Sequence, residues 1–263
     1  MLSEITIGRY IKRDSLIHGL DSRGKILITL LLIIGLFMVN NWKGYLLLAL
    51  LLVVIIYLSQ LQPGYLWQGV RPLLFIIAFT FLAHLLLTPG GRILWQAGPL
   101  VIYEGGLRQG LFLSGRILFL ILFTTLLTLT TSPLQLTDGV EYLLGPLKRI
   151  RVPAHELAMM MTIALRFIPT LLEEAEKIMK AQKARGADFE SGNLLKRARA
   201  FIPLLVPLFV SAFRRAEELS LAMEARAYQG GEGRTRMKEL KFKGQDYLAF
   251  LLSLVFVVLA III

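Results

Sequence analysis

Long apolar stretches dominate the chain and bracket a segment of different pattern. Four of these stretches precede residue 131 and a fifth runs to the C-terminus: 26–39, 45–58, 72–87, 107–130 and 247–263. Several are shorter than the roughly 20 residues that cross a bilayer as a helix, but polar and aromatic neighbours can complete them at the membrane interfaces. The pattern therefore predicts about five transmembrane helices.

Residues 132–243 have a different pattern of apolar and charged positions. Charges recur every few residues, and the apolar residues are spaced as on one face of a helix. The first part of this segment places apolar side chains at steps of three and four, which is one face of an α-helix. We expect this stripe to be formed by Leu157, Met161, Leu165, Ile168 and Leu172.

A second long amphipathic helix follows, with a stripe that includes Leu205, Leu208 and Ala212. A shorter amphipathic piece, residues 134–147, precedes both long helices. Proline inside a helix removes a backbone hydrogen bond and bends it. Kinks are therefore expected in the long helices at Pro169, Pro203 and Pro207.

These patterns predict an all-α integral membrane protein in three parts. Residues 1–131 form an N-terminal tail and four membrane helices, 132–243 form a domain of two long amphipathic helices and one shorter helix, and 244–263 form the last membrane helix. The N-terminal tail is basic, and residues 132–243 carry 19 Lys and Arg against 13 Asp and Glu. The positive-inside bias then places the N-terminus and the amphipathic domain in the cytoplasm and the C-terminus outside.

Composition removes several function classes. The chain is 56% hydrophobic and 18% charged with a net charge of +11, and it contains no cysteine. Disulfides, thiolate nucleophiles and cysteine-ligated metal sites are therefore excluded, and three scattered histidines do not predict a metal site. In a membrane protein this positive charge indicates cytoplasmic loops rather than nucleic-acid binding.

No motif for nucleotide binding or hydrolysis is present. The sequence has no phosphate-binding loop of the Gly-x-x-x-x-Gly-Lys-Ser/Thr type, no Gly-x-Ser-x-Gly and no His-Glu-x-x-His. The acidic run Glu173-Glu174-Ala175-Glu176 has lysines three and four residues further on, so solvated ion pairs explain it better than a metal site. We expect no catalytic residue and no cofactor in this chain.

Two similar segments stand at the ends of the long helices. The first is Ala184-Arg185-Gly186 and the second is Ala225-Arg226-Ala227. One explanation is structural, since arginine near a helix C-terminus complements the helix dipole and glycine provides a left-handed cap. The other explanation is docking, in which small neighbours let a partner approach and the guanidinium forms bidentate hydrogen bonds. Two such tips suggest two related partner subunits.

Arg116 and His84 fall inside apolar stretches, where an ionisable residue is a functional candidate. A structural role is favoured for both, since arginine can extend its guanidinium to the membrane interface. A self-contained permease or channel, which would need polar residues along the spans, is an alternative function. A membrane enzyme would need clustered carboxylates or histidines at one face, and the sequence shows no such cluster.

Several of these segments together resemble the transmembrane T component of energy-coupling-factor transporters, the ATP-driven importers of vitamins and metal ions in bacteria and archaea. The similar segments are residues 20–25 (LDSRGK), Arg116 with Thr124-Thr125, residues 153–157 (PAHEL) and residues 164–174 (ALRFIPTLLEE) up to the first tip. Ser22 stands where proline is usual, and Ala227 stands where the family often has glycine. The resemblance covers nearly the whole chain.

The resemblance implies a non-catalytic coupling subunit of the bacterial or archaeal cytoplasmic membrane. Its two long helices would cross as an X and place Arg185 and Arg226 in grooves of two ABC-type ATPase subunits, which bind ATP and Mg²⁺. The apolar stripes of these helices would hold a separate substrate-binding S component in the lipid bilayer. The transported substrate would be set by that S component, so this sequence does not indicate it.

Overall fold

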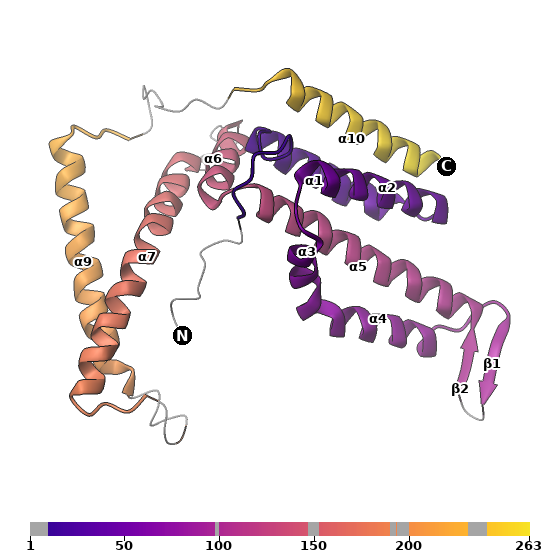
Figure 1. The fold of residues 1–263 in the computed structure, drawn as a ribbon, viewed down its shortest axis with the longest axis horizontal. Helices are drawn as coiled ribbons and strands as arrows, with labels where there is room; N and C mark the ends of the chain where they lie inside the picture. The colour runs from indigo at the N-terminus through magenta and orange to yellow at the C-terminus, as the bar shows by residue number, and fades with distance from the viewer. Residues whose placement is uncertain (1–9, 98–99, 147–152, 190–192, 194–199, 231–240) are drawn as a thin grey trace. The chain divides into compact units, whose positions relative to one another are not determined.

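The computed structural model describes residues 10–97, 100–146, 153–189, 193, 200–230 and 241–263, and most of them are helical (Figure 1). The chain forms two compact units. One comprises the described residues within Gly8–Gly139 and Glu239–Ile263, and the other comprises those within Val140–Lys238. We refer to them as the membrane unit and the hairpin unit.

The membrane unit contains a helix at each of the five predicted spans. Their bounds are α1 Ser22–Met38, α2 Trp42–Ser59, α4 Leu74–Leu87, α5 Glu104–Thr130 and α10 Gly244–Ile262. The prediction of an all-α membrane protein is confirmed. Long side chains such as Tyr57, Phe75 and Leu87 are about four-fifths exposed, as lipid-facing positions require.

Length and composition select a slightly different set of spanning helices from the predicted five. Among the described residues the segments long and apolar enough to cross a bilayer are α2, Pro63–Leu87, α5, α10 and also α7, Ala154–Ala184. The 17 residues of α1 fall just short of this set. α7 qualifies through its apolar first half, whereas its second half carries the acidic run and several lysines.

The third span is interrupted near its start. α3, Pro63–Val70, passes through a 3₁₀ turn, η2 Arg71–Leu73, into α4. Pro72 has no backbone N–H to donate, so the helix tightens there rather than continuing as regular α-helix. Arg71 therefore lies within a continuous helical segment.

A short hairpin joins α4 to α5, and the sequence patterns did not predict it. Its antiparallel strands are β1 Ile93–Ala97 and β2 Leu100–Tyr103, with an irregular register between Ile93 and Trp95. Such a short ladder has too few residues to show clear alternation.

Close helix packing in the membrane unit depends on glycine. A Cβ at Gly106 of α5 would lie 2.7 Å from the His84 carbonyl oxygen of α4, and a Cβ at Gly44 of α2 would overlap the Ala260 carbonyl oxygen of α10. Small residues at such crossings let helix backbones approach in a bilayer, where no hydrophobic effect drives helices together. The fully buried Leu36 and Leu48 lie in the core cluster that also contains Ala260.

The hairpin unit is built from two long helices, α7 and α9, and α9 spans Ile202–Ala225. The two helices pack against each other and are antiparallel (Figure 1). The Arg215 guanidinium of α9 donates to a Glu174 carboxylate oxygen of α7 at 2.9 Å. The rings of Phe189 and Phe201 pack at 5.5 Å between their centroids. The shorter helix α6, Pro133–Leu144, precedes the hairpin close to its predicted position.

Candidate functional site: two exposed arginine tips

The first tip ends α7 in a Schellman motif, with Arg185 as the C-cap. Gly186 has a φ of 87° and donates its N–H to the Lys183 carbonyl at 3.0 Å. The next residue, Ala187, donates to the Gln182 carbonyl at 2.9 Å. This pair of hydrogen bonds is typical of a helix that ends at a left-handed residue. The expected left-handed cap at Gly186 is confirmed.

The second tip ends α9 with the same geometry, and Arg226 is its C-cap. Ala227 has a φ of 53° and donates to the Glu224 carbonyl at 2.8 Å, while Tyr228 donates to the Met223 carbonyl at 3.0 Å. Alanine in the left-handed region costs about 1 kcal/mol that glycine avoids. The chain accepts this cost to close the second tip in the same way as the first.

Both arginines are exposed, as are Ala184 and Ala225 on the helix side of each tip. Neither guanidinium has a hydrogen-bond or ion-pair partner among the residues that the structure describes. Two carbonyls near the end of each helix already accept backbone N–H groups, those of Gln182 and Lys183 in α7 and those of Met223 and Glu224 in α9.

The two tips lie at opposite ends of the hairpin. The Tyr228 hydroxyl, just beyond the second tip, is 3.3 Å from His155 Nε2 at the start of α7. α9 has 24 residues, so at 1.5 Å per residue the tips are separated by about 36 Å. At this separation each tip can meet a different part of a partner surface.

The three prolines fall at different places in the hairpin. Pro169 and Pro207 lie inside α7 and α9, where each interrupts the ladder of backbone hydrogen bonds. The prediction of a kink at Pro203 is wrong, because this residue lies in the first turn of α9. Proline is favoured there, since the first backbone N–H groups of a helix have no partner within it.

The predicted apolar stripes do not form one uniform surface. Leu157, Met161 and Leu205 are between two-fifths and one-half exposed, and Ile168 is slightly less so. The other members are half-buried: Leu165, Leu172, Leu208 and Ala212. Ala212 lines a cavity of about 500 Å³ between the two helices, opposite Ile163 and Phe167. Part of the stripe is thus directed towards the partner helix of the hairpin.

A broader apolar surface on α9 was not predicted from the sequence. Its members are 54–73% exposed and follow one another along the first half of the helix: Ile202, Val206, Phe209, Val210 and Phe213. Their spacing gives the signal that could have identified them, since 202, 206, 209 and 213 advance by four, three and four residues. An apolar surface of this extent needs a covering layer, either lipid or protein.

Arg116 has a local structural role in the membrane unit. Its guanidinium donates to the Val39 carbonyl at 3.2 Å, the Asn40 side chain at 3.4 Å and the Tyr45 hydroxyl at 3.3 Å. These groups surround the turn between α1 and α2, which the arginine therefore holds. His84 lies within hydrogen-bonding distance of the Thr88 hydroxyl at the end of its own helix, 3.2 Å away.

The segment LDSRGK forms a buried charge cluster. Arg23 is 2% exposed and donates from Nε and a terminal nitrogen to the Asp21 carboxylate at 3.0 and 2.9 Å. Its guanidinium lies 4.2 Å from the ring centre of Phe242. The Asp21 N–H donates to Asp246 at 2.7 Å, and Lys25 donates to the Thr130 carbonyl at 2.9 Å. The cluster thereby joins α1, α5 and α10.

Burial opposes ionisation of Asp21, but the hydrogen bonds from Arg23 outweigh it and hold the pKa of this carboxyl below its usual range. Asp21 also caps α1, because its carboxylate accepts the Arg23 backbone N–H at 2.9 Å. The sequence patterns marked this segment only as part of a resemblance, and the long-range contacts explain its residues physically.

Comparison with known proteins agrees with this architecture. The profile of the CbiQ family, described as cobalt transport protein, matches residues 13–237. The chain belongs to the CbiQ family. The energy-coupling factor transporter transmembrane protein of Clostridium kluyveri is 52% identical over all of this chain and 97% of the relative. The protein of the same name from Thermosediminibacter oceani is 54% identical over 95% of this chain and 94% of the relative. The Bacillus subtilis protein of the same name is 51% identical over 94% and 93%.

Membership of the CbiQ family confirms the resemblance drawn from the sequence. The match begins before the segment LDSRGK and ends beyond the second arginine tip, so it includes both segments. The near-complete coverage of chain and relatives identifies a multi-pass transmembrane component of an energy-coupling factor transporter.

Proposed function

We propose that this chain couples two ABC-type ATPase subunits to a substrate-binding S component, and so transmits ATP-driven motion for uptake of vitamins or other micronutrients. The observation that carries the proposal is the pair of matching tips. Arg185 and Arg226 are exposed, unpaired among the described residues and presented by the same backbone geometry. In this proposal ATP and Mg²⁺ are bound by the ATPases.

Each tip suits a groove in a partner protein. A guanidinium can form two parallel hydrogen bonds to a carboxylate or to carbonyl groups. Ala184 and Gly186 beside Arg185, and Ala225 and Ala227 beside Arg226, add little bulk. A groove wall can therefore approach the backbone of each tip closely.

The hairpin suits transmission of motion. Both helices are long, and the Arg215–Glu174 ion pair and the Phe189–Phe201 contact connect them. When the ATPases move towards each other on binding ATP, each carries one tip, and the helix moves with it. Pro169 and Pro207 provide points at which the helices can bend.

The exposed apolar surface of the hairpin is proposed to contact the S component. Leu157 and Met161 of α7 and the apolar first half of α9 would otherwise face water. Non-directional apolar contacts allow one partner to be released and another to bind. The basic balance of residues 132–243 supports a cytoplasmic position for the hairpin, with the N-terminus inside and the C-terminus outside.

The docking proposal is tested by reversing both tip charges. The double variant Arg185→Glu, Arg226→Glu should lose the ATPases when the transporter is purified through this chain, because each groove would lose its cation and meet a carboxylate. The matched control is Lys177→Glu, Arg214→Glu, which changes the charge equally at exposed positions away from the tips. We expect the control to keep its ATPases.

Two results would contradict the proposal. One is retention of the ATPases and of ATP-dependent uptake by the tip variant. The other is substrate flux through liposomes that contain this chain alone, which would favour a self-contained permease. Circular dichroism of the purified variants separates loss of docking from loss of fold.

A further inference from the structure

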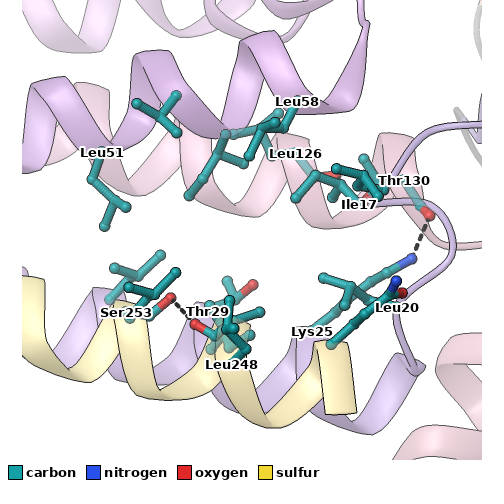
Figure 2. Close-up of a pocket in the computed structure, with 18 of the residues that line it drawn as sticks. Ile17, Leu20, Lys25, Thr29, Leu51, Leu58, Leu126, Thr130, Leu248 and Ser253 are labelled. Atoms are coloured by element: carbon teal, nitrogen blue, oxygen red, sulfur yellow. Dashed lines mark hydrogen bonds between the residues drawn. The ribbon is translucent and has the colours of Figure 1, made fainter. Parts of the chain in front are cut away.

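The membrane unit contains an apolar cavity of about 910 Å³ between α1, α2, α5 and α10 (Figure 2). Leu51 and Leu58 of α2, Leu126 of α5 and Leu248 of α10 line it. This volume is at the upper end of the range of small-molecule binding sites, roughly 300–1,000 Å³. The cavity does not depend on the arginine tips or on the hairpin unit.

The helix arrangement explains why the space is open. α2 meets α10 closely where Gly44 faces Ala260, near the start of α2 and the end of α10. The cavity lies towards the other ends of these helices, between residues 51–58 and 244–256. Its lining includes Val54, which is 42% exposed, and Leu248, which is 60% exposed, so the cavity opens sideways to the surrounding bilayer.

The cavity has a polar end and an apolar end. Figure 2 shows Lys25 and Thr130 together at one end, with Leu51 and Ser253 away from them. Lys243, just before α10, also lines the cavity. The Ser253 hydroxyl donates to the Ala249 carbonyl at 2.8 Å, so it presents no free donor to the cavity.

Lys25 is a buried cation with hydrogen-bonding capacity to spare. It is 5% exposed and lines the cavity. Its ammonium group donates to the His18 carbonyl at 3.1 Å and the Thr130 carbonyl at 2.9 Å, which accounts for two of its three N–H groups. Among the described residues no carboxylate is paired directly with its ammonium group, although the charges of Asp246 and Asp21 act on it.

We propose that this cavity holds one acyl chain of an anionic phospholipid, whose phosphate group lies at the Lys25 and Lys243 end. The bilayer supplies anionic phospholipids, in which long acyl chains adjoin one anionic head, and the polarity of the cavity matches one such chain with its head. Basic pockets between transmembrane helices bind such headgroups. A bound lipid would fill the space between α2 and α10 at the ends away from the Gly44–Ala260 contact and would stabilise both helices there.

The test uses the assembled transporter, purified through the full chain and placed in phosphatidylcholine nanodiscs. A small fraction of phosphatidylglycerol with a photoreactive diazirine on its acyl chain serves as the probe. After irradiation, mass spectrometry of peptides locates the label. We expect enrichment on the cavity-lining part of α10, residues 248–256, over the exposed lipid-facing surface of α4.

Two matched substitutions separate the cavity from general lipid contact. Thr29→Phe fills the cavity, because Thr29 lines it, and should remove the enriched label. Thr128→Phe makes the same change at an exposed position of α5 outside the lining and should leave the label unchanged. Equal labelling of α4 and α10, or unchanged labelling in Thr29→Phe, would overturn the proposal.

The headgroup requirement is tested separately. Phosphatidylcholine with the same photoreactive chain should label the cavity less than the phosphatidylglycerol probe does. Lys243→Gln, at an exposed position, should reduce the difference in labelling between the two lipids. Displacement of the probe by inorganic phosphate would mean that the cation end binds free phosphate, and would overturn the lipid assignment. Label that appears on the isolated chain but not on the assembled transporter would mean that a protein neighbour occupies the cavity, and would overturn it as well.

Discussion

The buried pair of Asp21 and Arg23 gives the sharpest prediction for stability. Both side chains are 3% exposed, and two hydrogen bonds of 2.9 and 3.0 Å join them. Arg23→Met keeps the apolar stem and removes the charge, so Asp21 is left as a buried carboxylate without its counter-ion. Breaking a buried ion pair in this way costs about 3–5 kcal/mol. The lost contact with the Phe242 ring adds to the destabilisation.

The free energy of unfolding is measured in mixed micelles by adding denaturing detergent and following circular dichroism. A second variant removes both charges, Asp21→Asn with Arg23→Met. It leaves no orphan carboxylate, so it should be more stable than Arg23→Met by about 1–3 kcal/mol. Arg13→Met serves as a control, because its hydrogen bond to the Gln60 carbonyl is solvent-exposed, and it should cost about 1 kcal/mol or less.

Two results would refute this reasoning. A loss of less than about 1 kcal/mol in Arg23→Met would mean that the pair is hydrated rather than buried. A double variant less stable than Arg23→Met would mean that the orphan carboxylate is not the source of the cost.

Three further predictions follow from individual positions. The pKa of Asp21 is lower in the folded than in the unfolded chain, where it is about 3.9, so the ionised carboxylate stabilises the fold at pH values above the unfolded pKa. This stabilisation is lost as the pH falls through the folded pKa. Asp21→Asn should therefore reduce the dependence of the free energy of unfolding on pH in the acid range, measured in the same micelles. Gly44→Ala should lower the free energy of unfolding by about 1–3 kcal/mol, whereas Gly64→Ala, with no atom near the added Cβ, should not. Gly186→Ala should speed amide exchange at the first tip, and Ala227→Gly should slow it at the second, because the left-handed conformation costs alanine about 1 kcal/mol.

Local signals in the sequence identified most of the helices correctly. Apolar runs found the spans, and the step pattern of three and four found α7 and α9, because these signals arise within single helices. The predicted kink at Pro203 was wrong because the apolar stripe does not show at which residue α9 begins. The hairpin of β1 and β2 was too short to give a pattern.

The sequence by itself determined the membrane class, the two arginine tips and the left-handed cap at Gly186, because spans and caps are set by neighbouring residues. Only the tertiary structure decided which apolar residues of α7 and α9 remain exposed, since this depends on the face each helix turns to the other. The tertiary structure also decided which residues form the buried charge cluster. Asp21 and Asp246 are 225 residues apart and meet only when α1 packs against α10. The cavity beside Lys25 has the same origin, since four helices must be placed before the space between them exists.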